Sequence, residues 1–215
     1  MKAVSGDKMM NKALGPVWHR KQKELGIVPK NLRGLDKEAT WSNSKADGWL
    51  YGHGSFCLVT HGIPIVGCFK WMRNAGNEAK RLWAEAGTCN GLVSYVCMDK
   101  KADDQALYRE FWEQRKVRLV TSPNRKHNKT PARRKMIREL RKKKYRKIYK
   151  ERSQTVEPMQ GLIKELFELD RCWMRGDVNN RWLFAAMGVA VQMAQRKALR
   201  AGQSTWNIRQ EVVGL

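Results

Sequence analysis

The chain has 215 residues and a formal net charge of +23, from 43 Lys and Arg against 20 Asp and Glu. A field of that sign attracts a polyanion and repels cationic surfaces, so nucleic acid is the first partner to consider. No apolar run approaches the ~18 residues of a membrane span, and the N-terminus lacks the apolar core of a signal peptide. The five cysteines contain no C-x-x-C pair, which fits a reducing compartment. We therefore expect a cytoplasmic protein without membrane contact.

The first half of the chain predicts an irregular region followed by regular structure. Residues 8–48 are rich in Lys, Arg, Gly and Pro and have weak periodicity, so we expect a loop excursion with one short helix. Residues 49–61 and 63–71 are β-rich runs separated at Gly62, which predicts a hairpin. The spacing of apolar residues predicts a helix over 77–86.

A continuous apolar run follows at residues 92–98 and is typical of a strand that is covered on both faces. Residues 103–114 predict a helix, because apolar residues repeat at helical intervals after an acidic start. Residues 117–121 predict a short strand. This order of strands and helices indicates a mixed α/β fold, and the chain length favours a single domain.

A dense basic segment spans residues 125–152. It holds 15 Lys or Arg and two acids, so its charge is +13 of the total +23. Such a run is often a solvated face or a disordered tail. Here it lies between two predicted core elements and carries apolar residues at helical spacing, so we favour an ordered helix that contacts DNA phosphates. The cations we assign to this contact are Arg133, Arg134, Lys142 and Lys143.

The last part of the chain predicts two helices and a tail. From Pro158 onward the apolar residues form one stripe, and at 100° per residue Glu157 and Lys164 fall on the opposite side. Glu157 can therefore face a cleft. Residues 181–196 are apolar nearly all round, which predicts a buried helix. Residues 201–215 are expected to form a C-terminal tail.

Two acids stand where phosphodiester chemistry would need them. Asp99 follows the predicted strand 92–98, and Glu157 lies beyond the basic segment. Mg²⁺ prefers a few carboxylates together with waters and substrate oxygens, so two or three acids from distant segments suffice. The simpler alternatives are a helix N-cap for Asp99 and a surface ion-pair ladder of Arg152, Glu157 and Lys164. The presence of both acids in one chain favours the metal site.

The same residues resemble the DDE transposases of bacterial insertion sequences. The resemblance rests on the pair Asp99-x-x-x-Asp103 and on Tyr149-x-x-Arg152-x₄-Glu157-x₆-Lys164. The strand-opening segment Gly48-Trp49-Leu50-Tyr51-Gly52-His53 adds to it. Family members carry three residues between the arginine and the glutamate, whereas this chain has four. The resemblance covers roughly residues 1–196.

The resemblance implies a ribonuclease-H-like catalytic domain, with a mixed sheet flanked by helices, over residues 1–200. It also implies a first catalytic acid, for which Asp7 is the best match because it stands eight residues before Gly15. Asp36 and Asp47 are the runners-up. Asp7, Asp99 and Glu157 are then expected to be catalytic and to hold Mg²⁺ or Mn²⁺. Three residues of the second motif would contact DNA: Tyr149, Arg152 and Lys164.

The implied activity is metal-dependent cleavage and strand transfer at insertion-sequence ends. The implied partners are those ends, the target DNA and a second copy of the chain in the assembled complex, in association with the nucleoid. Transposases of this type carry an N-terminal region ahead of the first strand, which suggests a 5′-truncated or internally started copy. The alternative is a catalytically inactive, basic DNA-binding remnant. The two hypotheses differ in whether the carboxylates converge.

Overall fold

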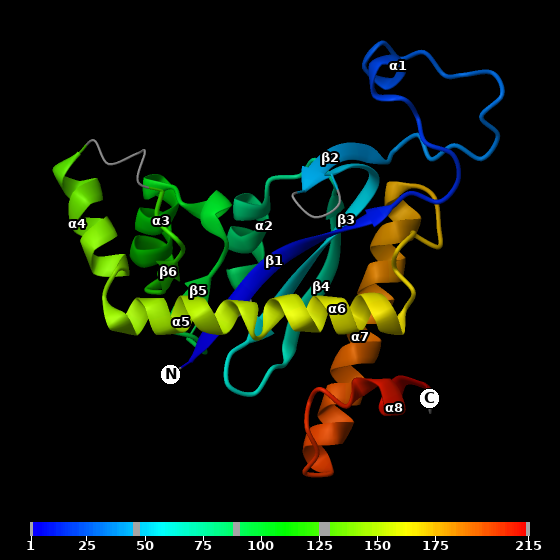
Figure 1. Cartoon of the computed structure of the whole chain (residues 1–215). Coiled ribbons are helices and arrows are strands. Elements are labelled where there is room, and N and C mark those ends of the chain that lie inside the picture. The colour runs from blue at the N-terminus through cyan, green and yellow to red at the C-terminus, as the bar shows by residue number, and fades with distance from the viewer. Residues whose placement is uncertain (1, 45–47, 88–90, 125–129, 214–215) are drawn as a thin grey trace. The chain divides into compact units, whose positions relative to one another are not determined.

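The computed structural model describes residues 2–44, 48–87, 91–124 and 130–213 (Figure 1). The chain divides into two compact units, each assembled from three separate segments. The first unit comprises residues 1–7, 57–68 and 77–160, and the second comprises residues 8–56, 69–76 and 161–215. Each unit is therefore held together by contacts between distant parts of the sequence.

The strands form a mixed sheet in the order β2, β3, β1, β5, β6, and β4 pairs with β3. The strand bounds are β1 Ala3–Lys12, β2 Thr40–Ser44, β3 Gly48–Thr60, β4 Val66–Arg73, β5 Tyr95–Cys97 and β6 Arg118–Val120. β5 is parallel to both β1 and β6, whereas β2 and β3 are antiparallel. Parallel neighbours need a crossover connection, which helix α3 (Gln105–Arg115) supplies between β5 and β6.

The first unit has its core where helix α5 (Lys143–Ser153) packs on β5 and β6. Tyr145 and Ile148 of this helix join Tyr95, Cys97 and Val120 in one buried apolar cluster. The first unit also contains three further helices: α2 (Glu78–Ala86), α3 and α4 (Pro131–Leu140). Each of these three begins at a residue whose side chain accepts hydrogen bonds from backbone N–H groups of the first turn, namely Asn77, Asp104 and Thr130.

The second unit contains helices α1 (Arg20–Glu24), α7 (Asp177–Arg200) and α8 (Ile208–Val213). Helix α7 packs closely on β4 because it carries glycine at the contact. A Cβ atom at Gly188 would lie 2.9 Å from the backbone oxygen of Phe69. One turn earlier, the ring of Phe184 meets the Phe69 ring edge-on, with centroids 5.7 Å apart.

Most of the predicted elements are confirmed. The hairpin corresponds to β3 and β4, and Gly62 has a positive φ of 80° in the connecting turn. The helices predicted over 77–86 and 103–114 are α2 and α3, and the strand predicted over 117–121 is β6. Helix α6 (Val156–Leu166) begins one residue before Glu157, as the one-sided apolar stripe predicted.

Four predictions about the elements are wrong in part. Residues 8–48 do contain the short helix α1, but they also contain the end of β1 and all of β2, and Trp18 and Ala39 are buried core residues. The buried strand predicted over 92–98 is only β5, and Leu92 is 62% exposed. Helix α7 is not buried all round, because Trp182 is 74% exposed. The expected tail contains α8, in which Ile208 is buried.

The basic segment also differs from expectation. Its described part, residues 130–152, forms two helices, α4 and α5, where one was predicted. Residues 125–129 lie outside the described residues. In the part of the chain that the structure describes, no helix has both the length and the apolar character needed to cross a membrane.

Candidate active site

Strand β1 carries Asp7 at its centre. The carboxylate lies in the first unit and is largely buried, with its side chain 16% exposed. Asp7 Oδ2 accepts a hydrogen bond from Arg152 Nη2 at 2.8 Å, although 145 residues separate the two in the chain. The pairing of β1 with β5 places Ser5 beside Cys97, so the stretch leading to Asp7 runs parallel to the stretch leading to Asp99.

Asp99 follows the end of β5 by two residues and caps a short 3₁₀ turn, Lys100–Ala102. Its Oδ1 accepts a hydrogen bond from the backbone N–H of Lys101 at 2.8 Å. The simpler role as a helix N-cap is therefore real. It uses one oxygen of the carboxylate, and the side chain stays half-buried at the edge of the unit.

Glu157 lies in the first turn of α6, where Val156 and Met159 are buried while the glutamate side chain is 49% exposed. Helix α5 ends at Ser153, and Gln154 and Thr155 form a turn before α6 begins. The break brings the glutamate back to the arginine, and Arg152 Nη1 donates to Glu157 Oε1 at 2.7 Å.

Arg152 is thus the common partner of two of the three predicted acids. Its side chain is 9% exposed, and the two ion pairs use different nitrogens of one guanidinium. Burial alone would lower the pKa of Arg152, but the negative charges of Asp7, Glu157 and Asp99 outweigh burial and raise it. Asp99 therefore lies close enough for its charge to act on the same guanidinium.

Lys101 provides a second cation near the acids. Its Nζ donates to Glu78 Oε1 at 3.0 Å. Burial acts to lower the pKa of Lys101, but the hydrogen bond and charge of Glu78, together with the charges of Asp99 and Asp7, raise it. Asp7 and Glu157 are therefore joined through Arg152 in the first unit, and the charge of Asp99 acts on both Arg152 and Lys101.

The donor set suits a hard divalent cation. Mg²⁺ and Mn²⁺ are bound by carboxylate oxygens, and one or two protein carboxylates with waters and substrate oxygens can complete the shell. Among the described residues, no three His, Cys, Asp or Glu side chains are grouped closely enough to enclose an ion by themselves. The structure instead holds the Arg152 guanidinium between Asp7 and Glu157, which shows that this site favours positive charge.

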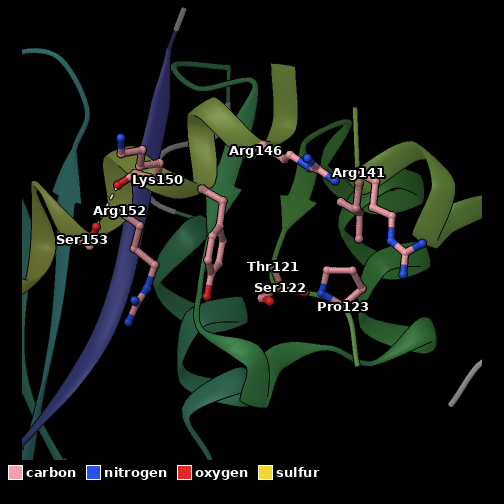
Figure 2. Close-up of a pocket in the computed structure, with 10 residues that line it drawn as sticks. Thr121, Ser122, Pro123, Arg141, Arg146, Lys150, Arg152 and Ser153 are labelled. Carbon is pink, nitrogen blue, oxygen red and sulfur yellow. Dashed lines mark hydrogen bonds between the residues drawn. The ribbon is translucent and has the colours of Figure 1, made fainter. Parts of the chain in front are cut away.

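A basic pocket of about 490 Å³ adjoins this site in the first unit, and Arg152 lines it (Figure 2). Arg152 and Lys150 approach from one side and Arg141 from the other, with Thr121 and Ser122 between them. The described lining contains four cations, three hydroxyl-bearing Ser or Thr residues, one tyrosine and no acid: Thr121, Ser122, Pro123, Leu140, Arg141, Arg146, Tyr149, Lys150, Arg152 and Ser153. Such a lining fits an anionic group.

The family model described as "Transposase DDE domain" matches residues 88–195, which is half of the chain. The chain belongs to the DDE transposase family. This membership confirms the resemblance to DDE transposases seen in the sequence. No match was found among curated protein sequences.

A solved structure supports the fold. The piggyBac transposase, in a cryo-EM structure of its synaptic complex with hairpin DNA, resembles this chain with a TM-score of 0.55 and 9% sequence identity. The likeness covers 98% of this chain and 51% of that chain, so this chain spans about half the length of that transposase. The expected α/β transposase fold is therefore confirmed.

The cations assigned to DNA contact in this transposase-family chain occupy different environments. Arg134, Lys142 and Lys143 are exposed on α4 and at the start of α5. Arg133 is not, because its side chain is 4% exposed and forms an ion pair with the buried carboxylate of Asp103. In this structure Arg133 is therefore held by Asp103 and not presented at the surface, and its assignment to DNA contact stays a prediction. Asp103 Oδ2 also accepts from the backbone N–H of Asn124 at 2.5 Å.

The remaining motif residues divide between the two units. Tyr149 lies on α5, lines the basic pocket and packs against the core of the first unit. Lys164 lies on α6, seven residues after Glu157, and belongs to the second unit, where its Nζ is 2.9 Å from Asp170 Oδ1. Of the predicted surface ladder, the ion pair between Arg152 and Glu157 is formed, whereas the described partner of Lys164 is Asp170.

Asp36, one of the two runner-up acids, belongs to the second unit. Asp36 is buried in the second unit, where its Oδ2 lies 2.8 Å from His53 Nε2 and accepts from the backbone N–H of Gly176 at 3.0 Å. Burial alone would raise the pKa of Asp36, but these hydrogen bonds lower it. Trp71 Nε1 donates a hydrogen bond to His53 Nδ1 at 3.1 Å, so the two ring nitrogens of His53 face Trp71 and Asp36. Asp47 lies outside the described residues.

Several functional candidates were missed in the sequence. Arg141, Arg146 and Lys150 line the basic pocket together with Arg152. A signal was present, because positions 146, 149, 150 and 153 share one face of a helix. In a segment where most residues are Lys or Arg, that periodicity is hidden. Lys101 was missed because its partner Glu78 is 23 residues away.

Proposed function

We propose that the chain is the catalytic part of a transposase that cleaves DNA strands at the ends of an insertion sequence and joins them to a target. Asp7, Asp99 and Glu157 would hold Mg²⁺ or Mn²⁺. The observation that carries this proposal is the Arg152 guanidinium, which binds Asp7 and Glu157 at 2.8 and 2.7 Å.

Each residue would have a defined task. When bound, the divalent ions supply the activation of the attacking oxygen and the stabilisation of the leaving oxygen. The three carboxylates supply oxygen ligands from β1, from the end of β5 and from α6, so the sheet fixes two of them and a helix fixes the third. Tyr149 and Arg152, one helical turn apart on α5, would position the DNA backbone beside them.

The shared Arg152 partner of Asp7 and Glu157 supports the enzyme over the inactive remnant. A remnant needs only a basic surface, and nothing in that role requires Asp7 and Glu157 to meet across 150 residues of sequence. The proposed partners are the element's ends, the target DNA and a second copy of the chain in the assembled complex. Activity on chromosomal DNA would place the protein at the nucleoid.

The exposed cations of α4 and α5 are proposed to supply much of the sequence-independent affinity for DNA. Changing Arg134, Lys142 and Lys143 to Gln together should lower the slope of log affinity against log salt by up to about 3, since each lost phosphate contact removes about 0.9. Fluorescence anisotropy of a labelled duplex across a KCl series measures this slope.

The matched control changes Arg196, Lys197 and Arg200 of α7 to Gln, which removes the same net charge. This control should leave the slope nearly unchanged. Equal reductions in the two triple variants would mean that binding follows net charge and that α4 and α5 are not a dedicated DNA surface.

The test of the function is strand nicking of a duplex that carries the element's ends, in Mg²⁺ and in EDTA. Nicking should require the metal and should be lost when Glu157 is changed to Gln. Equal nicking by that variant would remove Glu157 from the proposed site.

A further inference from the structure

Arg152 binds the carboxylate oxygens that a divalent ion would also need. Its Nη1 and Nη2 atoms bind Glu157 and Asp7. These oxygens are the ones that a divalent ion would need at the proposed site. A divalent ion and the guanidinium therefore compete for the same negative charge, since two cations held a few Å apart in a largely buried site repel strongly.

The same side chain also borders the basic pocket. Its Nε is buried and has no hydrogen-bond partner in the described part of the chain. Arg152 thus keeps one unused donor while its other two groups hold carboxylates. An unsatisfied buried donor on a charged group is costly, which makes an additional acceptor at this point favourable.

The pocket offers the chemistry of a phosphate site. Its cations come from α5 and from Arg141 just after α4, and its hydroxyls come from Thr121, Ser122 and Ser153. No described lining residue is acidic. Cations and hydroxyls without a carboxylate are the groups that bind phosphate oxygens in proteins, and arginine binds them through two parallel N–H groups.

We propose that Arg152 is an exchangeable cation. It neutralises Asp7 and Glu157 in the metal-free protein, and it transfers to a DNA phosphate in the adjoining pocket when a divalent ion takes its place. This inference rests on the proposed function, because it assumes that Asp7 and Glu157 hold the metal. The pocket is then a phosphate site. Metal binding raises the affinity for DNA, and DNA binding raises the affinity for metal, through the one side chain of Arg152.

The coupling follows from the two positions of the guanidinium. A metal ion that enters first releases Arg152 for a phosphate, and a phosphate that binds first draws Arg152 away from the carboxylates. By linkage, DNA must raise metal affinity by the same factor by which metal raises DNA affinity. Replacing Arg152 removes the competitor, so the DNA-free protein should bind the metal more tightly and the coupling should be lost.

The experiment measures Mn²⁺ affinity by electron paramagnetic resonance, with the full chain, in the absence and presence of a short duplex. Ca²⁺ replaces Mn²⁺ in parallel DNA-binding titrations so that strands are not cleaved. In the native protein, duplex should raise Mn²⁺ affinity roughly tenfold, the usual scale of coupling between two sites. Arg152→Gln should bind Mn²⁺ about that much more tightly without DNA and gain little from duplex.

Arg146→Gln is the matched control, because Arg146 lines the same pocket but has no described contact with the carboxylates. This variant should bind DNA more weakly and keep the Mn²⁺ affinity of the native DNA-free protein. Arg152→Lys should be intermediate, since one ammonium cannot bridge both acids as a guanidinium does. It also covers the case in which Arg152→Gln does not fold.

Weaker Mn²⁺ binding by both Arg152 variants in the absence of DNA would overturn the proposal, since it would mean that Arg152 only positions the acids. Unchanged coupling in Arg152→Gln would overturn it as well. Either result leaves metal-dependent nicking by the native protein intact. Failure of this inference is therefore distinguishable from failure of the proposed function, which the nicking assay decides.

Discussion

Replacing Glu157 by Gln is expected to reduce strand cleavage by roughly a thousandfold or more, the scale of loss when a group central to the chemistry is removed. The amide keeps the size of the side chain but removes the charge that a divalent ion requires. DNA binding should not weaken, because the change removes a negative charge and frees Arg152 from one of its two carboxylate partners. Nicking assays and anisotropy on one duplex measure both effects.

Glu165→Gln is the control on the same helix. Glu165 is also exposed and also pairs with an arginine, Arg209, at 2.9 Å, but it lies in the second unit. The Glu165→Gln variant should cleave DNA at the rate of the native protein. Native-like cleavage by Glu157→Gln, or equal loss in both variants, would contradict the assignment of the third acid.

Changing Arg133 to Met is expected to destabilise the protein by about 3–5 kcal/mol, because it leaves the carboxylate of Asp103 buried without its cation. The Asp103 and Arg133 side chains are 1% and 4% exposed. Asp103 also joins the start of α3 to the segment after β6, through Tyr108 and the backbone of Asn124. Loss of the pair should therefore loosen several elements of the first unit together.

Thermal melts should show the midpoint falling by roughly 10 °C for a chain of this length. Arg134→Met is the control. Arg134 is the next residue in the sequence and is exposed, so its replacement should change the melting midpoint little. If both variants melt as the native protein does, the buried pair contributes little. If Arg133→Met instead lowers the salt slope of DNA binding at native stability, Arg133 contacts DNA.

The sequence predicted the local settings of two of the proposed site residues. Glu157 was placed correctly because a one-sided apolar stripe fixes which face of α6 is exposed. Asp99 was placed at the end of a strand because a short apolar run is distinctive. Both signals are local, since they depend on residues within two helical turns or one strand.

The pairing of Asp7 with Arg152 could not be predicted in the same way. These residues are 145 positions apart, and only the fold brings β1 to the end of α5. The fate of Arg133 was hidden for a related reason. In a run of cations, no residue stands out in the sequence. Arg133 is buried because the fold brings the carboxylate of Asp103, 30 residues earlier in the chain, against it.

Amino-acid composition also gave wrong predictions of burial near both ends of the chain. Residues 8–48 look like a loop because they are polar and contain glycine and proline, yet Trp18 and Ala39 pack against Tyr51 in the second unit. Helix α7 looks buried because most of its residues are apolar, yet Trp182 is exposed. Tertiary contacts decide burial in both cases, and a count of apolar residues does not contain them.

The central claim is that Asp7, Asp99 and Glu157 are metal ligands, and a change in metal preference tests it most directly. Asp99→Cys should fail to cleave DNA in Mg²⁺ and regain cleavage in Mn²⁺, because a thiolate is a poor ligand for Mg²⁺ and a better one for the softer Mn²⁺. Asp99→Ala, which offers no ligand, should cleave in neither ion. Cleavage by Asp99→Cys in Mg²⁺ at the native rate, or equal inactivity of both variants in Mn²⁺, would contradict a metal at this carboxylate.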